Sequence, residues 1–203
     1  MSPSKQPARG EHAKPKRTAR KSSAAKQRSA PKSTAAKQRT ALTPAFPQTA
    51  GASGKQRLLF DLLRARATLM AAVQGLMGGA VEQPLGEGRW TVRETMLHLC
   101  AWDEMALRAF EPARRSIAPE WASARGAALD RLNARGVDAL RQHGWDDTLR
   151  LLQAGRQRLI ESVEEVSDQP ANVWARDHAL GAMLFDLTRN DRHHAEAIKR
   201  WRS

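Results

Sequence analysis

The sequence predicts an all-α protein, a four-helix bundle with a disordered basic N-terminal tail. Through most of residues 53–203 apolar side chains recur every three or four residues, the period of helices that bury one face. No strand-like alternation or nucleotide-binding glycine loop interrupts this pattern. The charge is uneven: residues 1–50 carry twelve Lys and Arg against one acid, and residues 51–203 carry 22 against 20. The chain therefore divides into a tail, residues 1–52, and one helical domain, residues 53–203.

The tail is built from Ala, Lys, Arg, Ser, Pro, Gln and Thr, and the unit Ala-Ala-Lys-Gln-Arg occurs at 24–28 and again at 35–39. Such a segment has too few large apolar side chains to offset the entropy of ordering, so we expect disorder. Cations spaced along a flexible chain bind phosphate backbones by releasing counterions, which predicts a nucleic-acid contact through residues 1–50. The alternative is a solubilising extension that binds polyanions only incidentally.

The first two helices have clear signals. The first begins near Ser53 and ends before Gly78-Gly79; its buried stripe is Leu58, Leu62, Ala65, Leu69, Val73 and Leu76. The second spans about residues 91–111, with Thr91 as N-cap and Glu94 closing a capping box.

The remaining segments complete the bundle. Residues 120–143 have a weaker pattern, with Gly126 and Gly136 inside it, and we interpret them as a crossover. Asp146 or Asp147 caps the next helix. The last helix spans about residues 180–201, and its heptad-spaced seam predicts packing at a shallow angle; the seam is Leu180, Leu184, Leu187, Asp191, His194, Ile198 and Trp201.

His98 is the unusual residue of the second helix. Residues 96–102 are apolar on every side of that helix except at His98, so the imidazole is expected to be buried and to need a partner. Cys100 lies in the same run and is interpreted as an inert small apolar residue. As the one cysteine of the chain, it excludes an internal disulfide and suits a reducing compartment.

The last helix carries the matching irregularity. Asp191 and His194 occupy seam positions where a bundle favours Leu, and Asn190 lies one turn before His194. We predict that these side chains point inward at the level of His98. Two hypotheses follow: an open metal or catalytic site, and a polar cluster in which Asp191 or Asn190 hydrogen-bonds a histidine and fixes helix register. Four tryptophans, Trp90, Trp102, Trp174 and Trp201, are candidates for the wall of a nearby pocket.

These motifs resemble a known family. The run from Trp90 to Glu94, His98-Leu99 and Trp102, together with residues 190–194 and 198–201, is similar to the DinB-like four-helix bundles. Leu132-Asn133-Ala134-Arg135, Trp145-Asp146 and Val166-Ser167-Asp168 agree with the ClbS/DfsB family among them. The resemblance covers about residues 55–203.

The resemblance implies a divalent metal, zinc or nickel, held by His98 and His194. The third family ligand position is Asn190, a poor ligand for either metal. The ClbS/DfsB family further implies hydrolytic opening of a strained ring on a DNA-damaging metabolite, in self-protection.

Two functions are therefore expected. The first is a hydrolase acting on a small electrophilic metabolite, with His98, Asp191 and His194 as catalytic residues. The second is a DNA-associated protein, anchored by its tail, with an inactive bundle. No apolar stretch is long enough for a membrane span, and we expect a cytoplasmic protein, either monomer or dimer.

Overall fold

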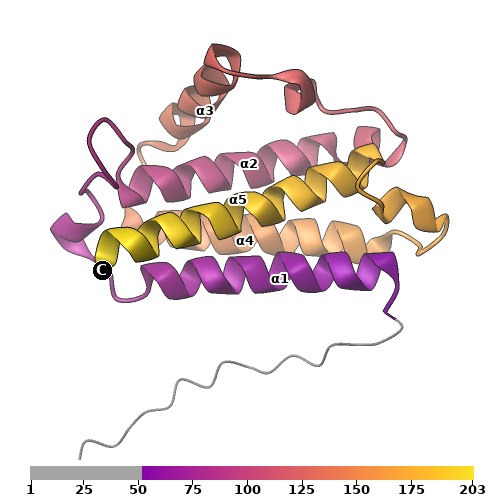
Figure 1. Cartoon of the computed structure of the whole chain (residues 1–203), viewed down its shortest axis with the longest axis horizontal. Coiled ribbons are helices and arrows are strands. Elements are labelled where there is room, and N and C mark those ends of the chain that lie inside the picture. Colours follow the sequence, from indigo (N-terminus) through magenta and orange to yellow (C-terminus); the bar gives the residue numbers. More distant parts are fainter. Residues whose placement is uncertain (1–51) are drawn as a thin grey trace, which may run out of the picture. The chain divides into compact units, whose positions relative to one another are not determined.

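The computed structural model describes residues 52–203, and these form an all-helical domain (Figure 1). Four long helices make up the core: α1 (Gly54–Val73), α2 (Val92–Arg114), α4 (Trp145–Glu165) and α5 (Ala179–Arg202). A shorter helix, α3 (Ala127–Leu140), and three 3-10 turns, η1 (Gly78–Ala80), η2 (Glu120–Ser123) and η3 (Ala171–Trp174), complete it. The predicted fold class is confirmed, whereas the predicted disorder of the tail concerns residues outside this range.

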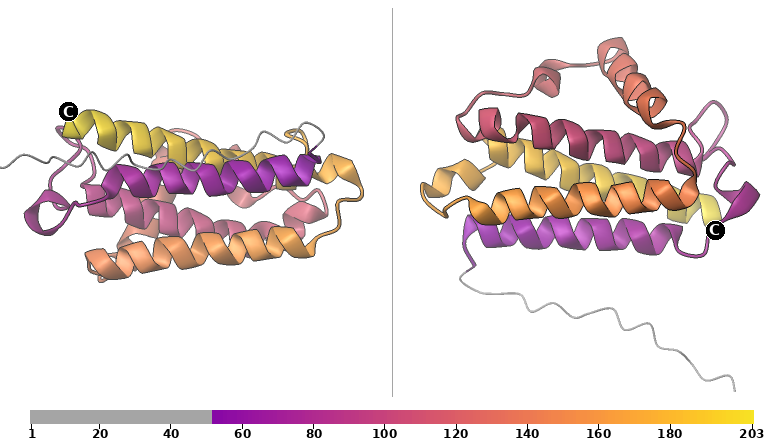
Figure 2. Two further views of the ribbon diagram at one scale, coloured as in Figure 1. Left: turned by 90° about the horizontal axis from the view of Figure 1, so that it is seen from below. Right: turned by 180° about the vertical axis from the view of Figure 1, so that it is seen from behind.

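Each core helix packs between two others. Helix α1 contacts α5 and α4, and α2 contacts the same two helices from the opposite side. Helices α1 and α5 run in one direction and α2 and α4 in the other (Figures 1 and 2). Because α2 and α4 are parallel, the chain has to return along the bundle between them. Residues 115–144 make this return on the outer side of α2, which confirms the predicted crossover.

Side-chain caps set several helix boundaries. Ser53 with Gln56 and Thr91 with Glu94 form capping boxes at the starts of α1 and α2, the second as predicted. The predicted cap of α4 is wrong. Its N-cap is Gly144, and both aspartates lie in the first turn, where their charge complements the helix dipole.

The core contains two apolar clusters. One gathers around Phe110, Leu159 and Leu184 and the other around Met96, Leu152 and Ile198. On each core helix a buried charged residue stands between members of the two clusters; these residues are Arg66, Asp103, Arg156 and Asp191. A layer of charge therefore divides the core. None of the helices within residues 52–203 is long and apolar enough to cross a membrane.

Helix α3 lies very close to α2. A Cβ atom added at Gly136 would lie 2.8 Å from the Cβ of Ala101, closer than two carbons pack without a shift. Gly136 therefore permits the approach rather than marking a weak helix. On the same side of α2, the indole Nε1 of Trp102 donates a hydrogen bond to Asn133 Oδ1 of α3 at 3.1 Å. These contacts hold α3 against α2 next to Trp102.

Candidate functional site: a histidine pair at a tryptophan-lined groove

Arg66, Asp103, Arg156 and Asp191 form one ionic network, which we call the charge layer. Arg66 Nη2 and Arg156 Nη2 each lie 2.9 Å from a carboxylate oxygen of Asp103. Arg66 Nε and Arg156 Nη1 lie 2.9 Å and 3.0 Å from Asp191 Oδ2. The two arginines also donate to the backbone carbonyls of Leu152 and Leu62. Each core helix thus supplies one charge, and the two cations balance the two anions.

The charge layer is a structural unit with all four side chains buried. Burial opposes the charge of Arg66, but Asp103 and Asp191 outweigh it, so the pKa of the guanidinium is raised. Such a network stays ionised inside a core because each charge has hydrogen-bonded partners.

Asp191 therefore does not lie with the histidines, contrary to expectation. Its carboxylate points between α1 and α4, where Arg66 and Arg156 bind it. The neighbouring residue on α5, Asn190, faces α2 instead. Arg66 and Arg156 were missed by the sequence reasoning, although each occurs within an apolar stripe, between Leu62 and Leu69 and between Leu152 and Leu159.

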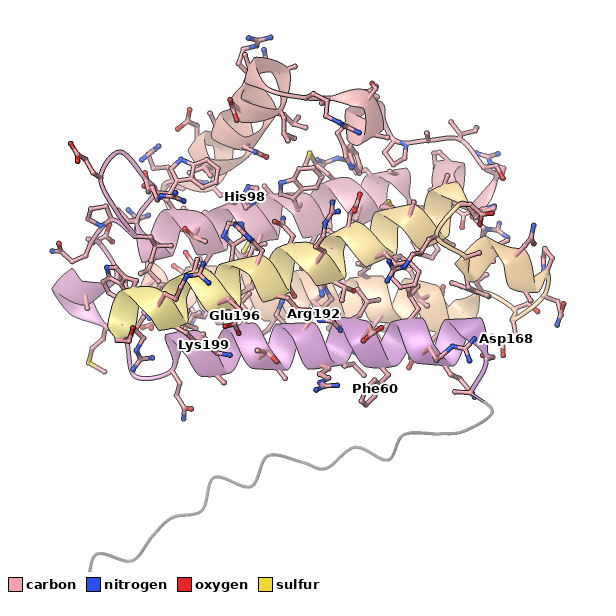
Figure 3. All side chains as sticks on the ribbon, in the orientation of Figure 1. Phe60, His98, Asp168, Arg192, Glu196 and Lys199 are labelled. Carbon is pink, nitrogen blue, oxygen red and sulfur yellow. The ribbon has the colours of Figure 1, made fainter. Side chains whose placement is uncertain are left out.

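The structure does bring together His98, Asn190 and His194, which we call the histidine cluster. His98 is buried on α2, beneath the segment that carries α3 (Figure 3). Asn190 Nδ2 lies 3.3 Å from His98 Nε2, and the rings of His98 and His194 stand edge to face with centroids 5.2 Å apart. His98 Nδ1 is buried and has no hydrogen-bond partner within residues 52–203. A buried polar atom left in this state is uncommon and suggests a ligand or water contact.

Both histidines are uncharged at neutral pH. The pKa of His98 is lowered to about 3, mainly by burial and to a smaller extent by the nearby His194, and the hydrogen bond with Asn190 acts in the opposite direction. Burial, followed by His193, lowers the pKa of His194 to about 4. Each neutral ring therefore has one unprotonated nitrogen, which can accept a hydrogen bond or a proton.

A groove of about 720 Å³ opens above the histidine cluster. Indoles form much of its wall: Trp90 lies 5.0 Å and Trp102 6.0 Å from the His98 ring centroid, and Trp121 packs edge to face on Trp102. Helix α3 contributes Asn133 to the opposite side. The volume suits a small organic ligand.

The predicted tryptophan wall is correct in part. Trp90 and Trp102 line this groove, and Trp201 lines the pocket that adjoins it. Trp174 does not, because it packs in the apolar cluster with Leu58 and Leu180. Trp121 was missed, since its position in the crossover gives no periodic signal.

Two other histidines and Cys100 lie outside the histidine cluster. His193 is exposed at the groove rim. His178 is the N-cap of α5 and also bonds Ser116. Cys100 is buried, and burial raises the pKa of its thiol to about 12, which suppresses the reactive thiolate.

The donor set does not fit the zinc or nickel centre that the resemblance implies. Within residues 52–203 no group of three His, Cys, Asp or Glu side chains is placed to hold a metal ion. His98 and His194 are two ligands, Asn190 is an amide, and the Asp191 carboxylate is held by two arginines. Structural and catalytic zinc sites use at least three strong protein ligands.

Fold and site together define a four-helix bundle in which two core helices present histidines to an aromatic groove. The chain matches the DinB superfamily over residues 61–198 and belongs to that family. Its fold is similar to a solved structure described as the colibactin self-resistance protein ClbS in complex with a dsDNA. The TM-score is 0.62 at 16% sequence identity, over 75% of this chain and 98% of that one. No curated protein matches the sequence.

Proposed function

We propose that the groove binds a small electrophilic metabolite and that the histidine cluster directs water against it, so that the protein is a protective hydrolase. One observation carries the proposal: two uncharged imidazoles stand together at the floor of an indole-lined groove, and one of them has a buried nitrogen without a partner among residues 52–203. The self-resistance role named for ClbS is consistent with protection.

His194 is the better placed general base. It is partly exposed in the groove and unprotonated at neutral pH, because its pKa is about 4. It would accept a proton from water as the water oxygen bonds to the electrophilic carbon. On a strained, activated ring, a ring C–C bond breaks and its electron pair moves to the activated carbon. The imidazolium then returns the proton to that carbon, which yields an alcohol by net addition of water.

His98 and Asn190 would orient water or substrate. Their contact at 3.3 Å fixes the His98 ring, and Nδ1 can bond a polar group that enters the site. Asp191 has no direct role in this proposal, because Arg66 and Arg156 hold its carboxylate. It acts as a positioning residue that sets the register of α5 and therefore the level of Asn190 and His194.

The test measures hydrolysis of activated cyclopropane electrophiles by liquid chromatography and mass spectrometry, in water enriched in oxygen-18. The wild-type protein should yield a ring-opened alcohol that carries the heavy isotope. H194A should lower the rate at least about a hundredfold, the usual contribution of a general base. H98A should lower it as well, and H143A, a change away from the groove, should not. Equal product formation with H194A and wild type would reject His194 as the base.

The metal expectation is tested on the same proteins. Elemental analysis of wild type and H98A measures bound zinc and nickel. The wild type should contain no stoichiometric zinc or nickel. If it does contain such a metal and H98A does not, then His98 is a metal ligand and a further ligand beyond His98, His194 and Asn190 completes the site in solution.

A second candidate function is association with DNA through the tail. The net charge of +11 on residues 1–50 favours the tail as the contact. The similar ClbS structure contains dsDNA, which favours association with DNA without indicating which part of this chain would bind it. We propose that the tail supplies most of the affinity, which should fall steeply with salt. Fluorescence anisotropy with a labelled duplex would compare the full chain with a variant lacking residues 1–50. Equal affinity of the two proteins would assign binding to the bundle.

A further inference from the structure

The groove continues past His194 into an adjoining pocket of about 700 Å³. The two share Trp90, Asn133, His193 and His194, so they form one continuous surface along α5. Beyond the shared residues, the second pocket is lined by a further indole, Trp201, and by two arginines, Arg89 and Arg200. We call this part the arginine end of the groove.

Arg89 and Arg200 differ from most arginines of the domain. Within residues 52–203 their side chains make no ion pair or hydrogen bond. By contrast, Arg93, the next arginine after Arg89, pairs with Glu82, and Arg192, two helical turns before Arg200, pairs with Asp61. Asp130 is the one acid that lines this pocket, and it lies on the α3 side. Within residues 52–203 the arginine end therefore presents two guanidinium groups whose hydrogen-bond donors are unoccupied, and Glu196 on α5 interacts with Arg200 only through its charge.

The opposite half of the groove is also lined by two arginines and one aspartate, but there the guanidinium groups already have partners. Arg189 there pairs with Asp186, and the guanidinium of Arg125 donates to the carbonyls of Ala122 and Ala124. The two histidines of the cluster, His98 and His194, are uncharged. Guanidinium groups with unoccupied donors thus gather at one end of an aromatic groove. Guanidinium groups bind carboxylate and phosphate oxygens in pairs, and indoles bind flat apolar groups.

We propose that the groove selects ligands with a flat apolar body and an anionic group, the body against Trp90 and Trp201 and the anion between Arg89 and Arg200. This assignment rests on the proposed role of the groove as a substrate site and narrows the substrate class. The reactive centre of such a ligand extends toward His98 and His194, and the anion sets its direction in the groove.

The experiment uses two probes of nearly equal shape, 1-naphthaleneacetate and the uncharged 1-naphthaleneacetamide, with isothermal titration calorimetry on the full chain at low salt. The wild type should bind the acetate at least about tenfold more tightly, as expected for charge-assisted hydrogen bonds to a guanidinium. The double variant R89Q/R200Q should bind both probes equally. The control R64Q/R115Q, which makes the same charge change at exposed arginines outside the groove, should keep the preference. A third probe, 1-naphthyl phosphate, shows whether a phosphate is bound more tightly than a carboxylate.

Three outcomes would overturn the proposal. These are equal affinity of wild type for acetate and amide, an acetate preference that survives in R89Q/R200Q, and no binding of either probe at millimolar concentration. The measurement needs no turnover, so it separates the two claims. A wild-type protein that hydrolyses its substrate but shows no acetate preference rejects the anion site alone, and a wild-type protein that shows the preference but no hydrolysis in any assay rejects the proposed reaction alone.

Discussion

The charge layer and the histidine cluster are both polar groups inside the same bundle, and they differ in how completely they are satisfied. In the charge layer each guanidinium contacts both carboxylates, and the four residues are buried with balanced charge. In the histidine cluster one contact of 3.3 Å joins Asn190 to His98, and the other nitrogen of that ring has no partner in the described part of the chain. A satisfied network holds helices together, whereas an incompletely satisfied one beside a groove is suited to bind something else.

Two neighbouring residues of α5 belong to these two different groups. Asp191 and Asn190 are adjacent in the chain, and a helix turns about 100° between them. One side chain faces the axis of the bundle and the other faces α2. A single step in sequence therefore separates a residue that supports the fold from one that belongs to the site.

Among the substitutions, D191N is expected to lower the free energy of unfolding the most. The change removes one of two carboxylates from a buried cluster and leaves Arg66 and Arg156 with excess positive charge. Breaking a buried ion pair costs about 3 to 5 kcal/mol in the free energy of unfolding. Urea unfolding followed by circular dichroism measures this, with D186N on the exposed face of the same helix as control.

A double substitution tests whether unbalanced charge is the cause of the lost stability. R66M/D191L removes one cation and one anion together, so the remaining Arg156 and Asp103 stay balanced. We expect this protein to be more stable than D191N although it carries more changes, because neutral apolar replacements of buried ions are tolerated. If it is less stable than D191N, packing rather than charge balance dominates this layer.

The histidine cluster should make the fold sensitive to acid. The unfolded chain protonates its histidines near pH 6.5, whereas the folded protein does so at about 3 for His98 and about 4 for His194. The unfolded state therefore binds more protons between these values, so stability is full above pH 6.5 and falls as the pH drops toward 4. The slope is up to about 1.4 kcal/mol per pH unit for each histidine.

The test compares stability at pH 7 and pH 5 by urea unfolding. H98Q/H194Q should lose part of the acid sensitivity of the wild type, while H143Q, which removes a histidine away from the buried pair, should retain it. Equal loss of stability on acidification in all three proteins would show that other groups carry the effect.

A smaller change is expected for H98L. The leucine removes an unsatisfied buried nitrogen from an apolar run, so stability should stay within about 1.5 kcal/mol of wild type or rise. By contrast L97A, at the adjacent buried position, should cost about 2 to 5 kcal/mol because it leaves a cavity. A loss for H98L as large as that for L97A would indicate a structural histidine.

Substitution of Cys100 is expected to have the smallest effect on hydrolysis. Burial and the raised pKa of its thiol should make it almost unreactive toward a disulfide reagent in the native protein, and C100A should leave hydrolysis unchanged. Absorbance of the released thiolate in native buffer and in urea measures the reactivity. Rapid labelling without denaturant would show that the region near His98 opens readily.

Much of the fold could be predicted from local signals. Apolar stripes predicted the four core helices, and the Thr91–Glu94 capping box marked the start of α2. The burial of His98 and its proximity to Asn190 and His194 also followed from the pattern, because seam positions of neighbouring helices must meet at a common level. The caps of α4 and the place of Trp174 did not, since glycine caps and irregular turns carry weak local signals.

The sequence by itself determined that this protein is a helical bundle with an excess of positive charge at its N-terminal end and a buried histidine in its second long helix. Only the tertiary structure decided that Asp191 belongs with Arg66 and Arg156 rather than with the histidines. The reason is physical: helix periodicity places a residue on a face, but the partner on that face comes from a helix 35 or 125 residues away in the chain. Which of two adjacent polar residues meets a charge, and which meets a groove, depends on how the helices are arranged around each other.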